Sequence, residues 1–154
     1  MKRFLLAIMI FLLVPVLVYA AGTNDCSKFT NFGNGFGMFT CVWTGDASTG
    51  AVPTATLNIP TDAFLLPGST SNGGDWIFQV VSVPGSPNPS ASWSMSITDS
   101  LSGATLDSET GLSNSAASTP TNPNKQVLSN TFKFAVTQTN HGAEGTTYIT
   151  IGGH

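Results

Sequence analysis

Apolar and polar residues alternate along most of this chain, which is the pattern of β-strands that bury one face. The clearest alternation runs from Ala91 to Thr98, where every second residue is apolar and every other one carries a hydroxyl. Residues 76–83 are apolar on both faces and predict a central strand. The remaining strand-like runs are 39–43, 55–59, 132–137 and 146–151. Helical periodicity is nearly absent, so six or seven short strands are expected.

The breaks between these runs contain turn-forming residues. Residues 84–89 include three prolines and a glycine, and residues 67–74 include three glycines and a proline. Such segments end strands rather than extend them. We therefore predict an all-β fold, an antiparallel β-sandwich or jelly roll in a single domain. This domain covers residues 39–154 and follows a Gly/Phe-rich segment at 21–38.

The first 20 residues have the features of an export signal. Two basic residues precede the uncharged apolar run Phe4–Val18, and the small residues Val18 and Ala20 fit a signal peptidase site. We predict a signal peptide at 1–20, cleaved after Ala20; the alternative is an uncleaved membrane anchor. Membrane contact is expected only through residues 1–20, if they remain attached. The protein is predicted to be secreted or extracytoplasmic, in the periplasm, at the cell exterior or in a virion.

Charge is scarce and biased toward acids. Only 8% of residues are charged, about a third of the roughly 25% that is usual. Beyond Ala20 the chain has three lysines, no arginine and eight acidic residues, which gives a net charge of −5. This composition excludes a protein that binds nucleic acid through its phosphates, because that requires clustered lysine and arginine.

Two cysteines, Cys26 and Cys41, both lie in the exported part. Cysteine pairs in oxidising compartments usually form disulfides. We predict a Cys26–Cys41 disulfide that stabilises the fold by roughly 3 kcal/mol. A redox or metal pair is disfavoured because it needs closer spacing or histidine partners.

Residues that could carry catalysis are few. The chain lacks the sequence motifs of serine hydrolases, zinc proteases and phosphate-binding loops. His141 and Glu144 lie three apart in the loop predicted at 140–145, where they could form an acid–base pair of a small hydrolase. A solvated turn is the favoured interpretation, so we expect no catalytic residues and no enzymatic activity.

Three acidic residues, Asp99, Asp107 and Glu109, fall in the connection predicted at 98–111. Together with serine and backbone oxygens they could hold calcium, which prefers six to eight oxygen ligands. The alternative is that Asp99 forms a turn while the other two face solvent. Apart from calcium, no metal or cofactor is expected.

The tryptophans offer a second binding hypothesis. Trp43 and Trp93 are in phase with apolar neighbours and are expected in the core. Trp76 follows Asp75 at the entrance of a strand, so this pair is the candidate for stacking on and hydrogen bonding to a sugar.

Three stretches, 39–50, 92–111 and 130–151, follow one another in a familiar order. They resemble small virion-associated proteins of tailed phages and prophages, whose role is unassigned. Asp99, Gly103, Leu106 and Gly111 occupy the positions of a loop found in those chains. The resemblance implies a structural role in a particle. The export signal and the cysteine pair depart from that pattern, and a membrane-containing virus or a host gene with the same sandwich would account for both.

The sequence thus predicts a non-enzymatic, exported structural or assembly module. It would bind protein partners or further copies of itself through a sheet edge or the Gly/Phe-rich segment. The alternative is an extracellular module that binds carbohydrate or another surface.

Overall fold

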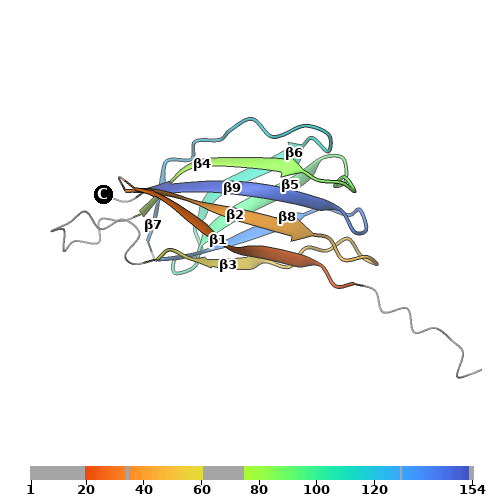
Figure 1. Cartoon of the computed structure of the whole chain (residues 1–154), viewed down its shortest axis with the longest axis horizontal. Helices are drawn as coiled ribbons and strands as arrows, with labels where there is room; N and C mark the ends of the chain where they lie inside the picture. Colours follow the sequence, from red (N-terminus) through yellow and green to blue (C-terminus); the bar gives the residue numbers. More distant parts are fainter. Residues whose placement is uncertain (1–19, 34, 61–74, 129, 153–154) are drawn as a thin grey trace, which may run out of the picture.

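Two antiparallel β-sheets lie face to face in the computed structural model, which describes residues 20–33, 35–60, 75–128 and 130–152 (Figure 1). One sheet has five strands in the order β1-β2-β9-β4-β7, and the other has four in the order β3-β8-β5-β6. The all-β sandwich prediction is therefore confirmed. The strands are β1 (Thr23–Gly33), β2 (Phe36–Thr44), β3 (Ala55–Asn58), β4 (Asp75–Pro84), β5 (Trp93–Asp99), β6 (Thr105–Leu112), β7 (Lys125–Val127), β8 (Thr131–Thr137) and β9 (Glu144–Gly152).

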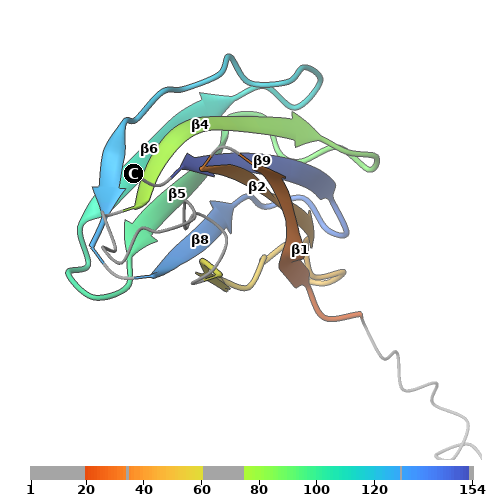
Figure 2. The same ribbon diagram turned by 60° about the vertical axis from the view of Figure 1, so that its left-hand side comes forward.

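The five-stranded sheet curls around the other sheet like half of a barrel (Figure 2). Its centre is β9, which pairs with β2 on one side and β4 on the other. β1 and β2 form a hairpin, so most of the Gly/Phe-rich segment at 21–38 lies within this sheet. β1 and β7 are its edge strands.

The core lies between the sheets and is built by the inward residues of each alternation. Trp43 from β2 and Trp93 from β5 are both buried, with ring centroids 5.2 Å apart, which confirms the prediction for these two tryptophans. A Cβ at Gly145 would overlap the ring of Trp43, so the neighbouring strand β9 needs glycine there. Other fully buried members are Leu57, Ile77, Val80, Ile97, Phe132, Phe134, Ile149 and Ile151.

The described chain begins at one end of the sandwich (Figure 1). There the segment at Ala20 and the loops that follow β2 and β8 are joined by hydrogen bonds. The amide of Ala47 donates to the carbonyl of Ala20 at 3.1 Å, and the amide of Gly142 donates to the carbonyl of Asp46 at 3.3 Å. The turn of the β1–β2 hairpin lies at the opposite end. There Phe32 is 55% exposed. The two ends therefore differ: bonded polar loops at one, an exposed aromatic side chain at the other.

Three strands were not anticipated from the alternation: β1, β6 and β7. The connection predicted at 98–111 is instead a short turn followed by β6, whose Leu106 and Leu112 are buried. Across the described part of the chain, no helix has the length and apolar character needed to span a membrane.

Candidate functional site

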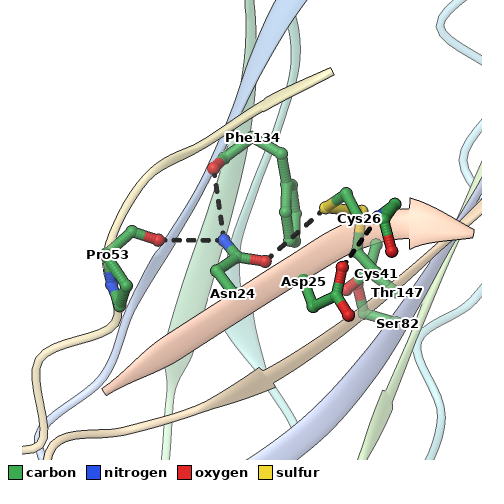
Figure 3. Close-up of a disulfide and its surroundings, with 9 residues drawn as sticks. Asn24, Asp25, Cys26, Cys41, Pro53, Ser82, Phe134 and Thr147 are labelled. Atoms are coloured by element: carbon green, nitrogen blue, oxygen red, sulfur yellow. Dashed lines mark hydrogen bonds between the residues drawn. A yellow bond between two sulfur atoms is a disulfide. The ribbon is translucent and has the colours of Figure 1, made fainter. Parts of the chain in front are cut away.

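The disulfide predicted from the sequence joins Cys26 of β1 to Cys41 of β2 (Figure 3). The pairing of these strands steps from Asp25 opposite Val42 to Lys28 opposite Thr40. Two residues of β1 therefore face one residue of β2, which is a β-bulge. The disulfide is buried beneath this bulge. Its presence fits an oxidising compartment.

Next to the disulfide, one side chain connects the two sheets. Asn24 donates from Nδ2 to the carbonyl of Pro53 at 3.0 Å and to that of Phe134 at 3.4 Å (Figure 3). Phe134 belongs to β8, so this amide ties the edge of the five-stranded sheet to the other sheet.

On the inner face of the five-stranded sheet, Cys41, Thr147 and Ser82 occupy one row across β2, β9 and β4. Ser82 and Thr147 are fully buried, and their hydroxyl oxygens lie 3.0 Å apart. This hydrogen bond satisfies two polar groups inside the sandwich.

A groove of about 450 Å³ opens between β1 and β3. These are edge strands of different sheets, so the groove lies along a seam of the sandwich. Its described lining is apolar at Cys26, Phe29, Phe39, Ala55, Leu57 and Pro60, and polar at Asn24, Asp25, Ser27, Thr56 and Asn58. The carboxylate of Asp25 accepts the amide of Ser27 at 2.9 Å. Hydrogen bonds from Ser27 lower the pKa of Asp25.

The outer face of the five-stranded sheet carries large apolar side chains. Val42, 52% exposed, pairs with Thr146, which in turn pairs with Val83. The neighbouring row of outward residues, closer to the β1–β2 hairpin turn, places Tyr148 beside Val81. Phe36 and Phe78 extend this surface toward the hairpin end, with ring centroids 5.3 Å apart. We call this surface the apolar outer face; its apolar members are Phe36, Met38, Val42, Phe78, Val81, Val83 and Tyr148.

The outer face of the four-stranded sheet is different in kind. The outward residues of β5 are Ser94, Ser96 and Thr98, alternating with buried Trp93, Met95 and Ile97. Across from them β8 presents Lys133, Ala135 and Thr137. We call this surface the hydroxyl outer face.

The three acidic residues predicted as a calcium site are not brought together. Asp99 is only 1% exposed and accepts hydrogen bonds from the amides of Leu101, Ser102 and Leu128 at 2.8–3.1 Å. It therefore organises the β5–β6 turn, as the alternative interpretation held. Among the residues that the structure describes, no three His, Cys, Asp or Glu side chains are grouped to hold a metal ion.

Asp107 and Glu109 are partly exposed and share a partner. The hydroxyl of Thr121 lies 2.9 Å from Asp107 Oδ2 and 3.1 Å from Glu109 Oε1. Burial, and secondarily the charge of Asp107, raise the pKa of Glu109. Thr121 itself pairs through its backbone with Val80 of β4. The two carboxylates thus lie where the 113–124 segment crosses between the sheets.

The residues predicted to bind a sugar lie at the start of β4. The backbone of Trp76 pairs with Gln126 and Gly152. The side chains of Asp75 and Trp76 lie outside the described part of the structure, so their role stays a prediction.

The two residues considered for acid–base chemistry are both exposed. His141 lies in the turn before β9, and Glu144 is the first residue of that strand. This is the arrangement of the solvated turn that was favoured.

The sequence reasoning missed two features of the loops and the seam. Asp46 accepts hydrogen bonds from the amides and hydroxyls of both Ser48 and Thr49, which hold its pKa far below the usual range. An aspartate followed by hydroxyl residues and a glycine is a local signal for this turn. The β1–β3 groove has no such signal, because its walls are distant in sequence.

No protein-family model and no curated protein matches this sequence. Among solved structures, a chain of the "Glycosylation Associate Protein (Gap123) complex from Streptococcus agalactiae" aligns with 11% sequence identity and a TM-score of 0.32. The alignment covers 87% of this chain and 45% of that one. A likeness this weak supports no conclusion about fold or function.

Proposed function

We propose that this protein is an exported, non-enzymatic structural module that associates with further copies of itself through the apolar outer face. The contrast between the two outer faces of the sandwich carries this proposal. Exposed sheet faces that are not interfaces usually carry polar residues, as the hydroxyl outer face does. The apolar outer face instead places large apolar side chains among outward threonines, and exposed apolar surface is typical of association sites.

The charges beside the apolar outer face, unlike the net charge, fit a second copy as the partner. Beyond Ala20 the chain has a net charge of −5, so most of its surface repels another copy. On the outward positions of β1, Asp25 and Lys28 flank the apolar outer face with one charge of each sign. In a two-fold arrangement the same surface meets itself, so each charge can approach its opposite.

The size of the face is adequate for a weak or moderate dimer. β2 and β9 pair over nine residues. The apolar members come from three strands, β2, β4 and β9, and three strands of nine residues, about 4.8 Å apart with a rise of about 3.3 Å per residue, cover roughly 430 Å² in projection. A stable interface buries about 800 Å² of accessible surface per partner, and corrugated side chains add to the projected area.

We further propose an extracytoplasmic setting, supported by the signal-like residues 1–20 and the disulfide. The resemblance of 39–50, 92–111 and 130–151 to virion-associated proteins favours a particle surface as the assembly.

The test is analytical ultracentrifugation of the exported protein over a range of concentrations. We expect wild-type protein to dimerise, and Val42→Lys to remain monomeric because it places a charge in the contact. Ser96→Lys, at an outward position of the hydroxyl outer face, is the matched control and should dimerise like wild type. A wild-type protein that stays monomeric at millimolar concentration, or equal loss in both variants, would contradict the proposal.

A further inference from the structure

The seam groove between β1 and β3 lies beside the apolar outer face, with Asp25 common to both, and has the chemistry of a small-ligand site. We propose that it binds a single pyranose sugar unit that is neutral or positively charged. This inference does not depend on self-association, because apart from Asp25 its residues lie along the seam rather than across the sheet.

The volume and lining of the groove agree with such a ligand. At about 450 Å³ it falls within the ~300–1,000 Å³ typical of small-molecule sites. Phe29, Phe39 and Leu57 supply apolar surface, while Thr56 and Asn58 supply hydrogen-bonding groups. A pyranose ring has the same division: its C–H groups pack on apolar and aromatic surface, and its hydroxyls need polar partners.

The electrostatics restrict the charge of the ligand. Among the described lining residues, Asp25 is the one with a formal charge, and no lysine, arginine or histidine is present. The Ser27 amide positions the Asp25 carboxylate at 2.9 Å, and a carboxylate retains further acceptor sites for hydroxyl or ammonium groups. The lining carboxylate therefore favours an amino sugar over a phosphorylated or acidic one, while the nearest cations, Lys28 and Lys133, lie outside the lining beside Ser27 and Thr56.

The partners of Asn58 give the groove a donor as well. Its Oδ1 accepts the hydroxyl of Thr131 at 3.1 Å. Because this bond uses the amide oxygen, the amide nitrogen is the group that can donate to a ligand oxygen. Donor and acceptor groups therefore line the same groove, which matches a ligand whose hydroxyls both donate and accept.

A peptide strand fits this seam less well, although both walls are edge strands. The bulge at Cys26 and Ser27 interrupts the regular edge of β1 where it lines the groove. The Ser27 amide already donates to Asp25, so it cannot join a new ladder. Bulges are a common means of blocking strand addition.

The groove is also held in place before any ligand arrives. The Cys26–Cys41 disulfide fixes β1 to β2, and the Asn24 amide fixes β1 to Pro53 and Phe134. A preformed site loses less entropy on binding, which suits a small ligand with few contacts.

The experiment is a titration of the ¹⁵N-labelled exported product with glucose, galactose, mannose, N-acetylglucosamine and glucosamine, followed by amide chemical shifts. We expect at least one sugar to shift the amides of Ser27, Thr56 and Asn58 together at millimolar concentration. If glucosamine binds, Asp25→Asn should weaken it roughly tenfold, the effect of losing about 1.4 kcal/mol, and should weaken N-acetylglucosamine less.

A second pair of variants separates the groove from general surface effects. Thr56→Trp fills the rim and should abolish the shifts, whereas Thr137→Trp, at an exposed position of β8, should leave them intact. The proposal is overturned if none of the five sugars shifts these amides, or if both tryptophan variants reduce binding equally. Shifts caused by an alternating Val/Thr peptide but by no sugar would assign the groove to strand addition instead.

Discussion

Strands β5 and β8 of the four-stranded sheet alternate apolar and polar residues regularly, whereas the five-stranded sheet places polar residues inside and apolar residues outside. In the former, inward Trp93 and Phe134 alternate with outward hydroxyl and lysine side chains. In the latter, the buried hydroxyls of Ser82 and Thr147 lie inside, while Val42 is 52% exposed outside. β5 and β8 have the pattern that folding alone requires. The five-stranded sheet has buried hydroxyls on its inner face and apolar side chains on its outer face that folding alone does not require, and this outer face is the surface proposed above for self-association.

The largest effect on stability is expected from a substitution on the inner face of the four-stranded sheet. Phe134→Ala removes a fully buried ring and should lower the free energy of unfolding by about 3–5 kcal/mol, measured by denaturant titration. Thr137→Ala, which alters an outward residue of the same strand, should change it by less than about 0.5 kcal/mol. Similar losses in both variants would show that the two faces of this sheet are not energetically distinct.

The disulfide is expected to make the next largest contribution to stability, and it lies within the five-stranded sheet. Replacing both Cys26 and Cys41 with alanine should lower the free energy of unfolding by roughly 3 kcal/mol, because a loop closed by 15 residues restricts the unfolded chain. Urea titrations of the variant and the wild type give the difference. A loss below about 1 kcal/mol would mean that β1 is held mainly by its pairing with β2.

The buried hydroxyls of Ser82 and Thr147 test how much a polar pair on the inner face of the five-stranded sheet contributes to stability. Ser82→Ala leaves the Thr147 hydroxyl without its partner and should cost about 1–3 kcal/mol. The double variant Ser82→Ala/Thr147→Val replaces both hydroxyls by apolar groups and should recover most of this loss. If unfolding measurements show additive losses instead, the hydroxyls do more than satisfy each other.

The smallest effect is pH-dependent and concerns Glu109 at the edge of the four-stranded sheet. Its pKa is raised in the folded state, so the folded protein binds this proton more tightly than the unfolded chain does. That stabilisation is complete below the unfolded pKa of about 4.3 and is lost as the pH rises through the folded pKa. Glu109→Gln should therefore raise the melting temperature slightly at pH 7, with no gain at pH 3.5.

The control for this prediction is Ser108→Ala, which removes no ionisable group and should keep the wild-type pH profile. A Glu109→Gln variant that is less stable than wild type at neutral pH would show that the ionised carboxylate is needed to hold Thr121.

The alternation of residues predicted the strands that have one apolar face, such as β5 and β8, because the alternation of apolar and polar residues continues along their whole length. β6 was missed because Asp107 and Glu109 occupy inward positions, and the hydroxyl that meets them comes from Thr121, a loop residue. β1 was missed because the bulge at Cys26 interrupts its period. Local patterns do not reveal such partners.

The contact surfaces were predictable only in part. The cysteine pair could be assigned from compartment and number. The groove could not, because it exists only where β1 of one sheet meets β3 of the other. Likewise, the outward position of Val42 follows from alternation, but its neighbours Thr146 and Val83 come from strands far along the chain.

The position of Ala20 beside Ala47 gives the molecule a direction. From there β1 carries the chain along 11 residues, roughly 35 Å at about 3.3 Å per residue, to the turn that presents Phe32. A group joined before Ala20 therefore lies at one end of the sandwich, and the turn of the β1–β2 hairpin lies at the other. A chain retained by its first 20 residues would display that hairpin away from the membrane, and an affinity tag fused before Ala21 would leave it unobstructed.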